Sequence, residues 1–193
     1  MDFDVALCVR PKLGEVVCGD AAFRVDRQGG LLLLVVDGTG HGPEARDAAA
    51  RVEDTVRASS ATEPAILLDL LDRALRGYVG AAAGVVRIDA SGRHLVYAGI
   101  GNVSARVVGT KEVRLVNRDG MLGQRFRTPR EQHIELQPTD AIVMHSDGIS
   151  EHFDSGSLPE LAWAPAARVA ALLLSRFGKR HDDASCLVAR TPR

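Results

Sequence analysis

Residues 31–42, with the sequence LLLLVVDGTGHG, constrain the fold more than any other part of the chain. Six apolar residues run directly into Asp37, and a short unbroken apolar run is typical of a strand buried on both faces. The glycines that follow let the backbone turn tightly. An alanine-rich stretch then begins at Pro43, a residue that favours the first turn of a helix. The pattern predicts a buried strand, a tight turn and a helix, with a carboxylate at the strand end.

Asp37 by itself admits two interpretations. A carboxylate beside a flexible turn can hold a hard cation, and it can equally cap the backbone amides of a strand–turn–helix corner. On this residue alone the capping role is favoured. The rest of the chain changes the balance, because the same arrangement returns later: the apolar strand at residues 141–145 leads into Asp147-Gly148.

Composition restricts the class of protein. The 193 residues are 46% hydrophobic, which fits one folded domain over residues 1–193. The formal net charge of −1 gives no support to a nucleic-acid or membrane partner. Three cysteines without CxxC spacing argue against a disulfide framework or a structural zinc site. The N-terminus lacks the features of a signal peptide, so we expect a cytoplasmic protein.

The remaining pattern predicts a mixture of short strands and amphipathic helices. Helices are expected at residues 43–58, 64–78 and 166–177. Strands are expected at residues 3–9, 15–25, 31–36, 83–89, 93–99, 103–109, 111–117, 132–136, 141–145 and 186–189. The four segments between 83 and 117 are separated by glycine turns and predict an antiparallel meander, with a hairpin corner at Gly101-Asn102.

Acidic residues recur at one kind of location. Each lies at a glycine break or at the edge of an apolar strand, and the set comprises Asp20, Asp37, Asp147 and either Asp182 or Asp183. Clustered carboxylates repel one another unless a cation neutralises them. An all-oxygen ligand set favours Mg²⁺ or Mn²⁺ over zinc. Two such ions sharing Asp37 could activate a water and stabilise the in-line displacement of a phosphoryl group, which indicates a metal-assisted phosphate hydrolase.

The blocks VVDGTGHG, SDGISE and DDAS, in this order and preceded by Gly19-Asp20, resemble the signature blocks of the metal-dependent protein phosphatases, the PPM family. The chain is most similar to the SpoIIE-like bacterial branch and, by its length, to the stressosome feedback phosphatases. The resemblance implies an α/β (α+β) fold, an αββα four-layer sandwich of two mainly antiparallel sheets flanked by helices. It also implies phosphoserine and phosphothreonine proteins as substrates, and two manganese or magnesium ions.

The resemblance also implies roles for individual residues. Asp37 corresponds to the ligand that bridges both metals, and the carbonyl of Gly38 to a backbone ligand of the first. The ligands of the second metal correspond to Asp20, Asp147 and Asp182. Asp183 stands where many members have asparagine, so it is expected behind the ligands.

Two features depart from the eukaryotic members. There, a histidine directly after the first Asp-Gly is proposed as the general acid, whereas here Thr39 and Gly40 precede His41. His41 could reach the leaving oxygen or could brace the loop. The basic residue that grips the substrate phosphate has no evident counterpart near Asp20, where Arg10 and Arg24 are the candidates.

Three hypotheses follow. The first is a protein phosphatase acting on phosphorylated stressosome scaffold or antagonist proteins, or alternatively on a phosphorylated anti-sigma-factor antagonist. The second is a catalytically silent regulatory module on the same scaffold, and the third is a phosphoesterase for small molecules. Retention of all the expected acidic ligands speaks against the second.

Overall fold

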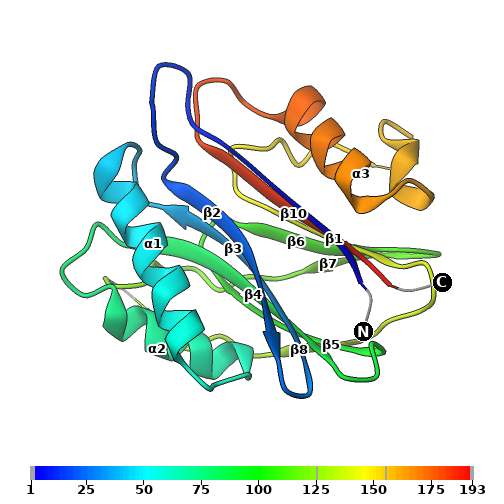
Figure 1. Ribbon diagram of the computed structural model, residues 1–193, viewed down its shortest axis with the longest axis horizontal. Helices are drawn as coiled ribbons and strands as arrows, with labels where there is room; N and C mark the ends of the chain where they lie inside the picture. Colours follow the sequence, from blue (N-terminus) through cyan, green and yellow to red (C-terminus); the bar gives the residue numbers. More distant parts are fainter. Residues whose placement is uncertain (1–2, 125, 155, 192–193) are drawn as a thin grey trace.

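The apolar run of residues 31–36 lies on the second strand of the first of two five-stranded sheets (Figure 1). The computed structural model describes residues 3–124, 126–154 and 156–191. The first sheet has the order β2-β3-β4-β5-β8, with strands β2 (Asp20–Arg27), β3 (Gly30–Gly38), β4 (Ala81–Asp89), β5 (His94–Ile100) and β8 (Gln132–Glu135). The second has the order β1-β10-β9-β6-β7, with strands β1 (Asp4–Arg10), β10 (Ala184–Arg190), β9 (Ala141–His145), β6 (Ser104–Val108) and β7 (Glu112–Leu115).

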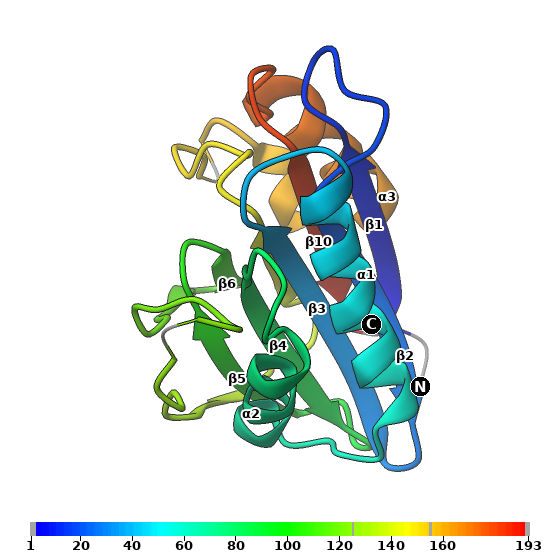
Figure 2. The same ribbon diagram turned by 90° about the vertical axis from the view of Figure 1, so that its left-hand side faces the viewer.

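Helices cover the outer face of each sheet. α1 (Pro43–Ala58) and α2 (Pro64–Ala74) lie on the first sheet, as Figure 2 shows. On the second sheet lie a short 3₁₀ helix, η1 (Pro159–Ala162), and α3 (Ala166–Leu172), which continues as the π-helical turn η2 (Leu173–Phe177). All strand pairs are antiparallel. The predicted αββα sandwich is confirmed.

Strand β3 is apolar on both faces because each face packs on a different layer. Leu32, Leu34 and Val36 pack among the buried residues of α1 and α2. Leu31, Leu33 and Val35 pack in the core between the two sheets. A strand with one face in water would carry polar residues at alternate positions. The unbroken apolar run therefore identifies a central strand.

Two predicted boundaries move for tertiary reasons. The strand expected at residues 15–25 begins only at Asp20, because the amides of Lys12 and Gly19 donate to the Asp183 carboxylate and residues 11–19 form a loop. The helix expected to reach residue 78 ends at Ala74, and the chain then turns at Gly77, whose φ is +92°.

The predicted meander is wrong at its centre. The hairpins β4–β5 and β6–β7 form as expected. However, β5 belongs to the first sheet and β6 to the second. Gly101-Asn102 is therefore a crossing between the sheets and not a hairpin corner. Turn residues mark where a chain bends but not which sheet it enters next.

The helices within the described part of the chain are all too short or too polar to span a membrane.

Replacing Leu33 with alanine should lower the free energy of unfolding by about 2–5 kcal/mol, because the side chain is fully buried between the sheets. Urea unfolding monitored by circular dichroism measures the change. Ile66→Ala is the matched control, since Ile66 on α2 is 51% exposed and should cost less than about 1 kcal/mol. Equal losses in the two variants would contradict this view of the core.

Candidate metal centre

Four predicted aspartates gather where the ends of the two sheets meet. Asp20 begins β2 and lies directly opposite Asp37 on β3. Asp147 follows β9, and Asp182 precedes β10. Elements of both sheets therefore supply carboxylates to one place. Each of the four aspartates lies at the end of a strand or within two residues of one, where the backbone leaves the core.

These carboxylates interact electrostatically. Burial raises the pKa of Asp37 to about 8, and the neighbouring charges of Asp20, Asp147 and Asp182 add to the effect. Burial likewise raises the pKa of Asp20 to about 7, against the opposing effect of the Ser146 and Ser185 hydroxyls. Such shifts are expected where carboxylates crowd together without a cation.

Three of these carboxylates, those of Asp37, Asp147 and Asp182, border an open cavity of about 630 Å³, and Asp20 lies behind Asp37 outside its lining. Its wall includes three of the predicted ligands, and its described lining residues are Asp37, Thr39, Gly40, His41, Ala82, Gly101, Asn102, Asp119, Gly120, Met121, Asp147 and Asp182. None of these lining residues is Lys or Arg. The cavity is thus acidic and open to solvent.

The donor set fits a hard divalent cation. Asp20 is 2% exposed, and its Oδ2 atom has no hydrogen-bond partner among the described residues. A buried carboxylate oxygen without a partner is costly unless a cation neutralises it. Within residues 3–124, 126–154 and 156–191, however, no group of three or more His, Cys, Asp or Glu side chains is already arranged around a metal position. Mutual repulsion favours such an open arrangement, and a cation would have to draw the oxygens together.

Asp183 stabilises the loop beside this centre. It is 3% exposed, and its two oxygens accept hydrogen bonds from the amides of Lys12 (2.7 Å) and Gly19 (2.8 Å). Both oxygens therefore bind backbone amides on the loop that leads to Asp20. Asp183 thus holds the backbone next to Asp20, and its place behind the ligands stays a prediction.

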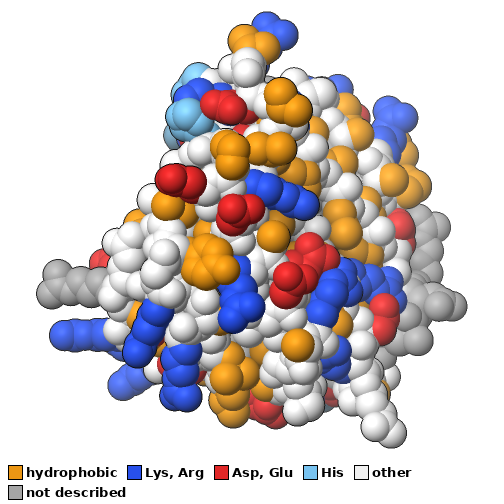
Figure 3. All heavy atoms as spheres, turned by 60° about the vertical axis from the view of Figure 1, so that its left-hand side comes forward, with side chains coloured by type: hydrophobic (Ala, Val, Ile, Leu, Met, Phe, Trp, Pro, Cys, Tyr) orange, Lys and Arg blue, Asp and Glu red, His pale blue; other side chains and the backbone are white. Residues whose placement is uncertain are grey.

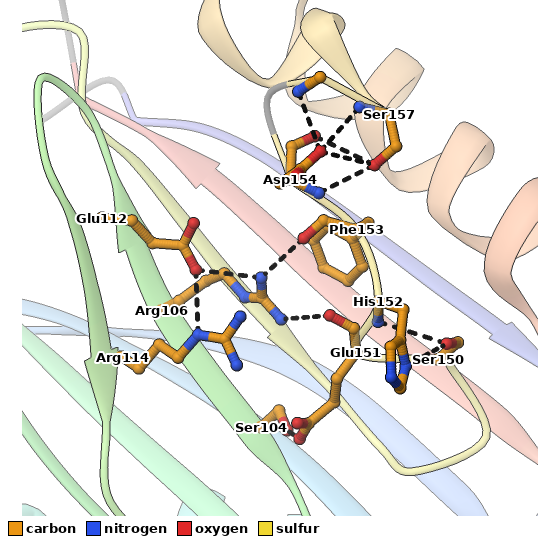
Figure 4. Close-up of polar contacts among 11 residues, drawn as sticks. Ser104, Arg106, Glu112, Arg114, Ser150, Glu151, His152, Phe153, Asp154 and Ser157 are labelled. Carbon is orange, nitrogen blue, oxygen red and sulfur yellow. Dashed lines mark hydrogen bonds and ion pairs between the residues drawn. The ribbon is translucent and has the colours of Figure 1, made fainter.

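A buried arginine holds the loop after Asp147. The Arg106 guanidinium donates to the carbonyls of Phe153 (3.1 Å) and Glu151 (3.4 Å), and it lies 4.1 Å from the centre of the Phe153 ring (Figure 4). It also forms an ion pair with Glu112 at 3.2 Å. Burial lowers the pKa of Arg106. The strands β6 and β7 thereby fix the chain that follows the SDGISE block.

The remaining candidates differ in whether they line the cavity. His41 lines the cavity, and its Nδ1 atom is 2.8 Å from Oε1 of Glu15. Neither arginine candidate lines the cavity among the residues described. Arg24 pairs with Asp26 at 2.7 Å, and Arg10 donates to the Lys179 carbonyl at 2.5 Å.

Comparison with known proteins decides the family. The family model described as Stage II sporulation protein E (SpoIIE) matches residues 27–192. The chain belongs to the SpoIIE family. Phosphoserine phosphatase RsbX of Bacillus subtilis (strain 168) is 28% identical over 92 residues, which is 48% of this chain and 46% of that protein. The chain thus matches about half the length of this curated relative.

Solved structures share the fold of this SpoIIE-family chain. A chain from a study of the bacterial stressosome, as a modular system adapted to control secondary messenger signaling, is 30% identical with a TM-score of 0.90, covering 98% of this chain and 100% of that one. RsbX in complex with magnesium is 20% identical with a TM-score of 0.85, covering 97% and 94%. The predicted resemblance to the PPM family and to its RsbX-like, stressosome-related members is confirmed.

Sequence reasoning missed two polar residues of this SpoIIE-family site. Asn102 donates from Nδ2 to Oδ2 of Asp147 at 2.8 Å and lowers the pKa of Asp37. Asp119 lines the cavity together with three of the predicted ligands. A signal was present for the second, because Asp119-Gly120 repeats the Asp-Gly pair found at Asp37 and Asp147. Asn102 was assigned to a turn.

Replacing Asp183 with alanine should lower the free energy of unfolding by about 2–4 kcal/mol, because two backbone amides would lose their acceptor. Chemical denaturation measures the loss. Asp26→Ala, which breaks the exposed pair with Arg24, should change the free energy of unfolding by less than about 1 kcal/mol. Similar values for both variants would refute the bridging role.

The metal-free protein should become less stable as pH rises from about 4 to about 8. The folded-state pKa values of Asp20 and Asp37, about 7 and about 8, lie above the ordinary value of 3.8. The folded state therefore binds more protons in this window, and each proton lost on raising the pH removes stability. Urea unfolding in chelator across this range tests the slope, and excess Mg²⁺ should flatten it. A slope unchanged in Asp37→Asn would contradict the assignment.

Proposed function

We propose that this chain is a metal-dependent protein serine/threonine phosphatase. The observation that carries the proposal is the convergence of Asp37, Asp147 and Asp182, from elements of both sheets, at one open acidic cavity, with Asp20 directly opposite Asp37. Membership of the SpoIIE family and the likeness to phosphoserine phosphatase RsbX support it. The proposal includes the organisation of residues 1–193 as one phosphatase domain.

The proposed ligands keep the roles expected from the sequence. Asp37 is proposed to bridge two ions, with the Gly38 carbonyl on the first and Asp20, Asp147 and Asp182 on the second. When bound, divalent ions (manganese or magnesium) supply the charge that neutralises these carboxylates and activates water for attack on phosphorus. Asn102 holds one oxygen of Asp147 at 2.8 Å and thereby orients it. The Asp20 oxygen without a described partner is the ligand atom most in need of a cation.

His41 is proposed to deliver a proton to the leaving serine or threonine oxygen. Oε1 of Glu15 lies 2.8 Å from Nδ1 and orients the ring, which leaves Nε2 as the nitrogen proposed to face the cavity. This orientation suits a general acid at the rim.

The proposed substrates are phosphorylated stressosome scaffold or antagonist proteins. The similarity to RsbX and to a chain from the bacterial stressosome supports this choice. A phosphorylated anti-sigma-factor antagonist is the alternative within the same chemistry. Incubation of the enzyme with each purified phosphoprotein, followed by phosphate release, distinguishes the two.

Asp37→Asn should reduce hydrolysis of p-nitrophenyl phosphate by at least about a thousandfold, because the amide cannot bridge two cations with two anionic oxygens. Phosphate release in manganese and in magnesium measures the effect. The fold should be retained, since the amide is isosteric and removes a carboxylate whose pKa is raised by burial.

The matched control is Asp26→Asn on β2, the same chemical change on an exposed residue outside the cavity. It should retain wild-type activity. Unchanged turnover in Asp37→Asn would reject the proposed phosphatase. Metal-independent partner binding by a wild-type chain without turnover would instead favour the silent regulatory module.

A further inference from the structure

The loop of residues 11–19, between β1 and β2, presents two aliphatic side chains to solvent beside the cavity. Leu13 is 75% exposed and Val16 is 94% exposed, the two largest values among the exposed large hydrophobic residues of the described chain. Single exposed aliphatic residues are common on protein surfaces. The position and rigidity of this loop distinguish these two.

Hydrogen bonds hold the loop at its base and at its tip. Asp183 binds the amides of Lys12 and Gly19, which lie near the two ends of the loop. The amide of Leu13 donates to the Arg180 carbonyl at 3.0 Å. Gly14 has a φ of +96°, and the amide of Glu15 closes the turn on the Lys12 carbonyl at 3.0 Å. A surface already ordered in this way loses little conformational entropy when a partner binds.

The loop touches the edge of the cavity through Glu15. Glu15 contacts His41, which lines the cavity, and the two side chains are 2.8 Å apart. In Figure 2 the loop lies at the same end of the molecule as the turn after β3 and the connection before β10. Figure 3 shows hydrophobic side chains at the top of this face, close to histidine and acidic side chains. A molecule seated in the cavity therefore lies next to this loop.

The cavity wall itself offers little to hold a protein substrate. Its described lining residues include no Lys or Arg, and four of them are aspartates: Asp37, Asp119, Asp147 and Asp182. A folded protein that delivers a phosphoserine must also cover the rim, because a standard protein interface spans about 800 Å² on each partner. The core of such a footprint is apolar, and exposed aliphatic side chains on an ordered loop next to the cavity are in a position to supply that contact.

We propose that Leu13 and Val16 form the docking platform for the folded phosphoprotein substrate, whose phosphoserine enters the metal cavity. The partner presents an apolar patch beside its phosphorylated residue. This inference rests on the proposed phosphatase function and names the surface that selects the protein substrate. A small phosphate ester occupies only the cavity and does not use the platform.

The test compares Leu13→Ser, Val16→Ser and the double variant with the wild type on two substrates. The substrates are p-nitrophenyl phosphate and the phosphorylated stressosome protein proposed above. Each single variant should lower kcat/KM for the phosphoprotein about tenfold, and the double variant about a hundredfold, chiefly through KM. Hydrolysis of p-nitrophenyl phosphate should stay at the wild-type rate. Ile66→Ser is the matched control, because Ile66 is 51% exposed on α2 and should change neither rate.

Several outcomes would overturn the proposal. Unchanged phosphoprotein kinetics in the double variant would do so, as would an equal loss on both substrates, which would indicate a damaged cavity. If sedimentation shows that the wild type self-associates and the double variant does not, while the phosphoprotein kinetics are unchanged, the surface binds a second copy of the chain. If the wild type fails on p-nitrophenyl phosphate, the proposed function itself fails. If it hydrolyses that ester but neither phosphorylated scaffold nor antagonist protein, the proposed protein-phosphatase activity fails in favour of a phosphoesterase for small molecules, whereas an active wild type with an unaffected double variant rejects the docking proposal alone.

Discussion

Repulsion among buried carboxylates is the constraint on which the rest of this structure depends. Asp20 and Asp37 lie directly opposite each other on neighbouring strands, where like charges destabilise a sheet. Burial raises the pKa of both carboxyl groups, the charge of Asp20 adds to the effect at Asp37, and the charges of Asp183 and Asp182 add to it at Asp20. The surrounding fold has to hold them in place against this force. The centre therefore resembles other functional sites, which are locally unfavourable and stabilised by the remainder of the molecule.

The stabilising structure has two parts. Apolar layers on both faces of β3 fix the strand that carries Asp37. Around the centre, single polar residues hold the irregular segments: Asp183 binds the loop before Asp20, and Arg106 binds the loop after Asp147. Each uses hydrogen bonds to backbone groups, which constrain the chain path more directly than contacts between side chains. The segments that carry the proposed ligands therefore have a constrained backbone path, although these aspartates are not part of the hydrophobic core.

The sequence predicted regular elements well where local chemistry determines them. α1 was predicted with both its ends, because Pro43 marks its first turn and its small apolar residues repeat on one face. β9 was equally clear as an unbroken apolar run before an Asp-Gly pair. The start of β2 was wrong, since Asp183, 164 residues away from Gly19, draws that segment into a loop. The hairpin at Gly101-Asn102 was wrong because turn residues do not specify which sheet receives the next strand.

By itself the sequence determined most of the strands and helices and the positions of Asp37 and Asp147 after apolar strands, because hydrophobic periodicity and Asp-Gly pairs are encoded within a few neighbouring residues. Only the tertiary structure decided that β2 begins at Asp20 and what surrounds these aspartates. Asn102 reaches Asp147 across 45 residues of sequence, and Asp183 reaches Lys12 across 171. Such contacts form when the two sheets pack together, and no local pattern specifies them.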